Sequence, residues 1–160
     1  MADLNRLLQR LLDRKFEFVL VGGFAGVLHG ASQVTRDIDI CMALDPSIIG
    51  QLRSELADLH PVHRQTPQKL SFLDHPTGLA TVRNLYLQTD LGPLDILSEI
   101  IGVGPFDVVA SGATTIFLYG MKCLVIGLDD LIASKEALGR DRDRLAVTEL
   151  RAIRDKIQKS

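Results

Sequence analysis

Residues 18–42, FVLVGGFAGVLHGASQVTRDIDICM, decide the fold of this chain. The apolar run FVLV leads into the pair Gly22-Gly23, which predicts a buried strand that enters a tight turn. The segment FAGVLH then favours a short helix that ends at the next glycine. In residues 36–42 charged and apolar side chains begin to alternate, which predicts a second strand.

Three aspartates are the candidate functional residues. Asp37 and Asp39 lie two positions apart in the second predicted strand, so both carboxylates project from one face. Asp95 lies between apolar residues in the predicted strand 93–97, where a carboxylate costs several kcal/mol unless it is paired or binds a metal. Carboxylate oxygens are ligands that Mg²⁺ prefers, and two ions held between them can activate a hydroxyl and stabilise a leaving pyrophosphate. The three acids therefore predict a divalent-cation site.

The glycine pair adds a phosphate-binding element to these acids. Because Gly22 and Gly23 have no side chains, their backbone N–H groups can approach a phosphate closely. An Asp-x-Asp pattern alone is usually a solvated strand face, and a Gly-Gly pair alone is usually a turn. Their order and spacing, with the third acid, favour the functional interpretation. A dinucleotide-binding fold is disfavoured, since Gly22, Gly23 and Gly26 lack the Gly-x-Gly-x-x-Gly spacing.

The rest of the chain predicts further helices and strands around this segment. Helices are expected over residues 3–14, 45–59, 129–138 and 142–157, and strands over 70–73, 82–89, 93–97, 115–119 and 122–126. Residues 60–69 and the glycine-rich residues 102–112 are expected to be loops. We predict one α/β (α+β) domain over residues 1–160, a mixed β-sheet flanked by helices. Its core is expected over about 17–127 and a C-terminal helical segment over about 128–160.

Composition narrows the classes of partner. Eighteen basic and 20 acidic side chains give a net charge of -2, which offers no bulk attraction for nucleic acid or a membrane surface. No apolar stretch approaches the roughly 20 residues of a membrane helix, and residues 1–15 carry charges instead of an apolar signal core. We expect a cytoplasmic protein with no membrane partner. Cys41 and Cys123 match no metal-ligand spacing, which favours buried free thiols.

Two parts of the chain resemble the DNA polymerase β-like nucleotidyltransferase superfamily. The motifs GGFA through LHG at 22–30 and TRDIDI at 35–40 resemble its signature. The motifs LDDLIASK at 128–135 and GRDRD at 139–143 resemble the C-terminal segment of its small bacterial members, the minimal nucleotidyltransferases and AbiEii-type toxins. The resemblance implies a mixed sheet with flanking helices and a Mg²⁺-dependent nucleotidyl transfer.

The resemblance also implies roles for single residues. It gives metal binding and catalysis to Asp37, Asp39 and Asp95, and nucleotide binding to Gly22, Gly23 and Lys135. In the family the third acid can help to activate the acceptor hydroxyl, and the lysine reaches the triphosphate. A lysine suits that place as a compact point charge. Mg²⁺ is the expected cofactor, with Mn²⁺ as the alternative.

The chain departs from the family pattern at two positions. Many relatives carry a serine at the second residue of the turn or directly after it, but here Gly23 is followed by Phe24. Gln33 stands where many relatives have an arginine. Arg36 is not expected to replace that charge, because strand alternation would point it away from Asp37.

Two hypotheses follow for the function. The leading one is an enzyme that transfers a nucleoside monophosphate from a nucleoside triphosphate to a hydroxyl on tRNA, a protein or a small molecule. The bacterial relatives suggest a toxin–antitoxin setting, with an antitoxin or a second copy of the chain as partner. The alternative is a catalytically degenerate protein that binds nucleotide and metal and acts through a partner. Acceptor recognition is expected from the loop around residues 60–80 and from the C-terminal helices.

Overall fold

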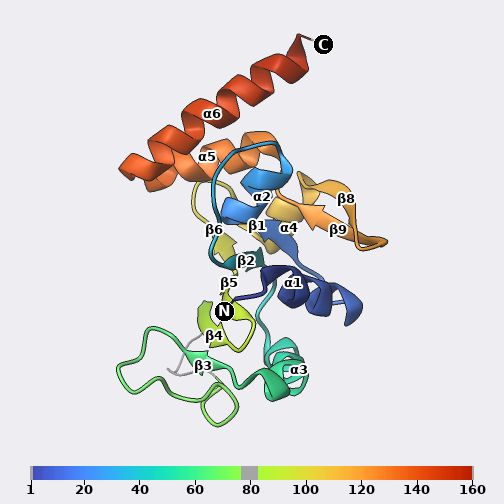
Figure 1. Ribbon diagram of the computed structural model, residues 1–160, viewed down its shortest axis with the longest axis vertical. Helices are drawn as coiled ribbons and strands as arrows, with labels where there is room; N and C mark the ends of the chain where they lie inside the picture. The colour runs from blue at the N-terminus through green and yellow to red at the C-terminus, as the bar shows by residue number, and fades with distance from the viewer. Residues whose placement is uncertain (1, 77–82, 160) are drawn as a thin grey trace.

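A seven-stranded mixed sheet forms the centre of the computed structural model, which describes residues 2–76 and 83–159 (Figure 1). The strands lie in the order β3-β4-β5-β2-β1-β9-β8. A separate pair, β6 and β7, forms a small second sheet. The strand bounds are Val19–Val21 (β1), Ile38–Cys41 (β2), Val62–His63 (β3), Asn84–Thr89 (β4), Gly92–Leu97 (β5), Glu99–Ile100 (β6), Gly104–Pro105 (β7), Thr114–Leu118 (β8) and Met121–Val125 (β9).

Pairing directions in the sheet are mixed, as the sequence predicted. β1 runs antiparallel to β2 and parallel to β9, while β2 runs parallel to β5. β4 and β5 form a hairpin, and so do β8 and β9. Ile38 and Ile40 of β2 and Leu94 and Ile96 of β5 are fully buried on the face that carries no aspartate. The side chains between them, including Asp39, therefore project to the opposite face.

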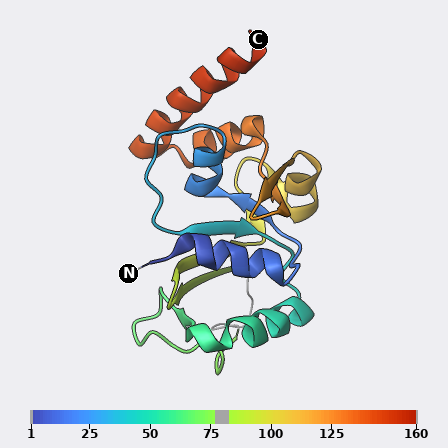
Figure 2. The same cartoon turned by 45° about the vertical axis from the view of Figure 1, so that its right-hand side comes forward.

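The helices cover both faces of this sheet. α1 packs against β2 and β9, and α2 packs against β1 and β2. Figure 2 shows strands of the sheet lying between α1 on one side and α2 and α5 on the other. α5 and α6 pack on one another. The helix bounds are Leu4–Asp13 (α1), Gly22–Leu28 (α2), Pro46–Leu56 (α3), Phe106–Ser111 (α4), Leu128–Leu138 (α5) and Asp141–Gln158 (α6), with a 3₁₀ turn at Ala57–Leu59.

The strongest local patterns correspond to the observed helices. Four leucines of α1 are buried, and Asp3 caps the helix by accepting a hydrogen bond from Arg6 N. Asp45 caps α3 in the same way. Gly139 ends α5 with a φ of +64°. No helix in the described ranges is long and apolar enough to cross a membrane.

Three sequence predictions in the middle of the chain are wrong. The expected loop at 102–112 contains β7 and α4, because its glycines lie only near its two ends and the residues between them form a helix that buries Val109. The expected loop at 60–69 contains β3, which pairs with β4. The expected strand 70–73 is reduced to one bridge, between Val62 and Ser71. Val82, the expected start of β4, lies outside the described residues.

Candidate functional site

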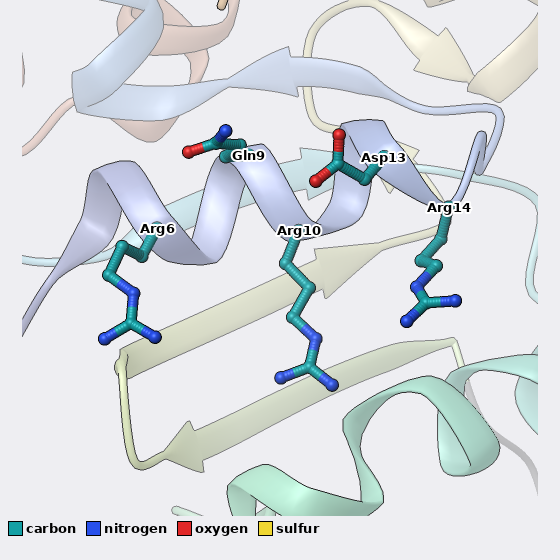
Figure 3. A pocket seen from close by; sticks show the side chains of 5 residues that line it. All are labelled: Arg6, Gln9, Arg10, Asp13 and Arg14. Carbon is teal, nitrogen blue, oxygen red and sulfur yellow. The ribbon is translucent and has the colours of Figure 1, made fainter.

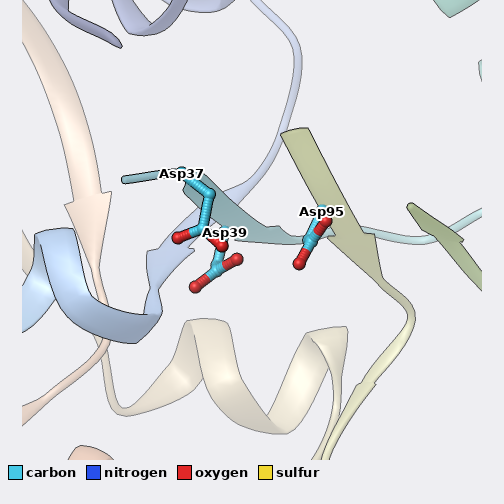
Figure 4. Close-up of side chains that lie close together, drawn as sticks. All are labelled: Asp37, Asp39 and Asp95. Carbon is cyan, nitrogen blue, oxygen red and sulfur yellow. The ribbon is translucent and has the colours of Figure 1, made fainter. Parts of the chain in front are cut away.

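Sheet register brings the three predicted aspartates together. In the parallel pair β2–β5, Asp39 and Asp95 are direct cross-strand partners. Asp37 lies one residue before β2, on the same side as Asp39. The three side chains point toward one another in Figure 4, and each offers a carboxylate oxygen within 4.8 Å of the others. Residues that are far apart in sequence therefore form one acidic cluster, the Asp triad.

Burial and like charge raise the pKa of two of these carboxyls. The pKa of Asp39 rises from 3.8 to about 7, first because of burial and then because of the charges of Asp37 and Asp95. Lys135 opposes that rise. Burial also raises the pKa of Asp95, while the Arg64 guanidinium acts in the other direction. Carboxylates this close repel one another when ionised, and a bound divalent cation would offset the repulsion.

The oxygen donors of the Asp triad fit a hard divalent cation. Oδ1 of Asp95 is buried and accepts no well-aligned hydrogen bond from residues 2–76 or 83–159, although Nη2 of Arg64 lies 2.7 Å away as an ion-pair partner. Such an oxygen keeps lone pairs available for a metal. Mg²⁺ is commonly bound by one or two carboxylates together with substrate phosphates and waters. The triad could therefore hold Mg²⁺ or Mn²⁺, and its role as metal site remains a prediction.

The glycine turn lies directly against this cluster. Gly22 follows β1 with a φ of +69°, and a Cβ at this position would come within 2.8 Å of Cγ of Asp39. Only glycine meets both requirements, the backbone conformation and the space. A Cβ on Gly23 would instead lie 3.3 Å from Oγ1 of Thr35. Gly22 thus makes room for the Asp39 carboxylate, which is a requirement that the sequence did not predict.

Lys135 lies beside the acids, as the resemblance implied. Its side chain is 15% exposed, and Nζ lies 3.7 Å from Oδ1 of Asp143. Asp143 is 1% exposed and accepts hydrogen bonds from Nε and Nη2 of Arg140, at 2.6 and 3.2 Å. Because α5 carries the lysine and α6 the aspartate, this contact ties both C-terminal helices to the site. The sequence did not predict the role of Asp143, since its exposed-looking motif GRDRD shows no sign of burial.

Two cavities open beside the Asp triad. The first, which we call the Gly23 cavity, has a volume of about 640 Å³ and is lined by Gly23, Thr35 and Arg36 among others. The second, the Asp95 cavity, has a volume of about 330 Å³ and is lined by Asp95 and Tyr86 among others. Five residues line both cavities: Asp37, Asp39, Lys135, Arg140 and Arg142. These five residues therefore lie at the boundary between the two spaces, whereas Asp95 lines only the second.

Arg36 differs from its prediction. It was expected to point away from Asp37 through strand alternation, but β2 begins only at Ile38, so alternation does not apply to it. Arg36 instead lines the Gly23 cavity, as Asp37 does. It adds a positive charge to that cavity, in the neighbourhood where Gln33 lacks one.

Arg64 is the main functional candidate that sequence analysis missed. It lies in the segment expected to be a loop, where its neighbours show no pattern. Its backbone N donates to Tyr86 O at 2.8 Å, which places its guanidinium against Asp95 and 6.0 Å from the centre of the Tyr86 ring. The pairing of β3 with β4 creates this contact, and no local sequence pattern predicts it.

A further hollow lies along α1, away from the triad (Figure 3). Arg6, Arg10 and Arg14 project from the same side of the helix. Arg10 pairs with Asp58 at 2.5 Å and Arg14 pairs with Glu55 at 2.8 Å. Arg10 and Arg14 thus tie α1 to the 3₁₀ turn and to the end of α3, so we assign these two arginines a structural role.

Comparisons by sequence find no relatives: no protein-family model and no curated protein matches the chain. Solved structures do match. A candidate nucleotidyltransferase from Thermotoga maritima superposes with a TM-score of 0.56 at 18% identity, covering 97% of this chain and 92% of its own. An antigenic nucleotidyltransferase-like protein from Paracoccidioides brasiliensis gives 0.58 at 14% identity, over 94% and 72%. The lincosamide antibiotic adenylyltransferase LnuA, bound to lincomycin, gives 0.60 at 18% identity, over 92% and 94%. These matches confirm the resemblance at the level of architecture: the chain has the nucleotidyltransferase fold.

Proposed function

We propose that this chain transfers a nucleoside monophosphate from a nucleoside triphosphate to an acceptor hydroxyl. The observation that carries the proposal is the convergence of Asp37, Asp39 and Asp95 within 4.8 Å on a nucleotidyltransferase fold. Lys135 and the Gly22 turn lie directly beside the acids. Positioned carboxylates, a divalent cation and a phosphate-binding cation are the parts that phosphoryl chemistry requires. LnuA, an adenylyltransferase of the same fold, supports this class of reaction.

In this reaction the acceptor oxygen forms a bond to the α-phosphorus. The bond from that phosphorus to the oxygen that bridges to the β-phosphate breaks, and pyrophosphate leaves. Mg²⁺ bound by the Asp triad would lower the pKa of the acceptor hydroxyl and offset the phosphate charge. Asp95 is positioned to accept the hydroxyl proton, and Lys135 to contact the triphosphate. Gly22 and Gly23 keep the turn free of side chains on the phosphate side.

Calorimetric titration with Mn²⁺ and each nucleoside triphosphate, together with a pyrophosphate-release assay, tests the proposal. Asp39→Ala is expected to abolish metal-dependent nucleotide binding. Lys135→Ala is expected to weaken it by about 10- to 100-fold, since a hydrogen bond to a charged group contributes about 1.5–3 kcal/mol. Lys122→Ala, which truncates an exposed lysine on β9, is the matched control. Unchanged Mn²⁺–nucleotide affinity in Asp39→Ala would contradict the assignment.

Tight nucleotide binding without turnover on any acceptor would identify the alternative, a degenerate protein that binds nucleotide and metal. A toxin–antitoxin setting, an antitoxin partner and a homodimer follow from the family resemblance and remain predictions. Coexpression with a neighbouring gene product, followed by measurement of the oligomeric state, addresses them separately from catalysis.

A further inference from the structure

We propose that the acceptor is a small hydroxylated molecule with an apolar face and no negative charge, and that it binds in the Asp95 cavity. This inference rests on the proposed function and names the class of its second substrate. Three features of the cavity carry it: the charges on its walls, its apolar side chains and its size.

Charge separates the two cavities. Lys135, Arg140 and Arg142 line both, so they do not distinguish them. Among the described residues, the charged ones that line only the Gly23 cavity are Arg36 and Asp143, so that together with the shared residues its wall carries four cations against three aspartates. The Gly23 cavity therefore has a net positive wall, which suits a triphosphate.

The Asp95 cavity has the opposite character. In the described part of the chain, the charged residues that line this cavity alone are Asp95 and Glu99. Together with the shared residues, its wall carries four acids against three cations; Asp95 is paired with Arg64 at 2.7 Å, and Glu99 is exposed at the start of β6. An acceptor with phosphates would meet these two acids, whereas an uncharged or amine-bearing acceptor would not be repelled. The proposal therefore disfavours RNA as acceptor.

Exposed apolar side chains line the same cavity. Ile101 is 60% exposed and Leu138 is 42% exposed, although both are large hydrophobic residues. Leu97 adds to this wall, and Tyr86 contributes its ring while its hydroxyl accepts a hydrogen bond from Asn84 Nδ2 at 3.0 Å. Apolar walls with a few polar groups are typical of small-molecule sites. An acceptor with an apolar face would therefore pack well against this wall.

Size agrees with that class. The Asp95 cavity, at about 330 Å³, lies at the lower end of the roughly 300–1,000 Å³ typical of small-molecule sites. Asp95 lines it from β5 and Lys135 from α5. An acceptor whose hydroxyl reaches Asp95 must therefore fit between β5 and α5.

The test uses the purified chain with Mg²⁺ and each α-labelled nucleoside triphosphate. Three acceptor pools are supplied separately: the low-molecular-mass fraction of a cell extract, total tRNA, and the protein fraction. We expect labelled product only from the low-molecular-mass pool, at least 10-fold above the sample without acceptor. Label in tRNA or in protein would overturn the proposal. No label from any pool, with Mn²⁺–nucleotide binding intact, would refute the transfer reaction itself.

A variant locates the acceptor. Ile101→Asp places a charge on the apolar wall. It is expected to raise the apparent KM, the amount of the low-molecular-mass pool that gives half the maximal rate, at least 10-fold. The affinity for Mn²⁺ and nucleotide should change less than 2-fold. Phe117→Asp is the control, because Phe117 is 67% exposed on β8 and lines neither cavity. An unchanged KM in Ile101→Asp would overturn the placement. If the unmodified chain does not bind nucleotide in the presence of Mn²⁺, that result counts against the proposed function instead.

Discussion

Asp39→Asn is expected to stabilise the metal-free protein, because the carboxyl of Asp39 is held where its ionised form is unfavourable. In the folded chain its pKa is about 7, against the ordinary 3.8, chiefly through burial and then through Asp37 and Asp95. Between these two pH values the unfolded chain releases the proton while the folded chain retains it. The free energy of unfolding therefore falls as pH rises through this range.

The magnitude follows from the same shift. At about 1.4 kcal/mol per pKa unit, the difference between 3.8 and about 7 corresponds to about 4 kcal/mol above pH 7. Asparagine has nearly the same size and cannot ionise, so Asp39→Asn should recover about 2–4 kcal/mol at pH 8. It should recover close to nothing at pH 4, where the native carboxyl is already neutral. For a chain of this length the gain at pH 8 corresponds to about 10 °C in Tm.

Urea unfolding at pH 4 and pH 8, in the presence of a chelator, measures this difference. Asp74→Asn, at an exposed turn position, is the control and should change the free energy of unfolding by less than about 0.5 kcal/mol. Added Mn²⁺ should stabilise the native protein by mass action but not Asp39→Asn. A gain that is equal at both pH values, or absent at pH 8, would refute the reasoning.

Two further substitutions test the surroundings of the triad. Gly22→Ala should lower the Mn²⁺ affinity measured by titration at least 10-fold, because the added Cβ would collide with Asp39. Gly120→Ala is the control, because Gly120 has a φ of +76° and open space around it. It imposes the same backbone strain of about 1–2 kcal/mol and should leave the Mn²⁺ affinity unchanged. Arg64→Gln removes the cation that opposes the raised pKa of Asp95, so more of this carboxyl should be protonated at pH 6. Mn²⁺ affinity should therefore fall more at pH 6 than at pH 8. An equal loss at both pH values would show that Arg64 does not act through the Asp95 carboxyl.

Local sequence patterns were sufficient to predict those helices whose stripe, cap or end is encoded by residues close together in the chain. The leucine stripe of α1, the Asp45 cap of α3 and the Gly139 end of α5 are each written within a few residues. The segment 102–112 was misassigned because Gly102 and Gly104, with φ of +83° and +137°, correctly indicate a turn but say nothing of the helix after it. The burial of Val109 in that helix depends on tertiary packing, which local composition does not contain.

The Asp triad could be predicted as a set, but its geometry could not. The Asp-x-Asp spacing predicted that Asp37 and Asp39 share one side, and the two do converge although Asp37 precedes β2; the apolar neighbours of Asp95 indicate an unusual carboxylate. The opposition of Asp39 and Asp95, by contrast, is set by a parallel pairing across more than fifty residues of chain. Arg64 and Asp143 reach the site through β3–β4 pairing and α5–α6 packing. Such contacts are non-local, so no short window of sequence reveals them.

The missing serine of the turn and Gln33 are the two departures from the family pattern that slightly favour a degenerate protein, and Thr35 bears on the first of them. A Cβ on residue 23 would lie 3.3 Å from Oγ1 of Thr35, a tight contact that would require a small shift of the threonine side chain. The Thr35 hydroxyl lies at the Gly23 cavity and donates to the carbonyl of Asp37 at 3.0 Å. Redirecting it to a phosphate would exchange a neutral hydrogen bond, contributing about 0.5–1.5 kcal/mol, for a charged one of about 1.5–3 kcal/mol. Because Thr35 already places a hydroxyl beside Gly23, the absent serine does not by itself leave this side of the turn without a hydroxyl group.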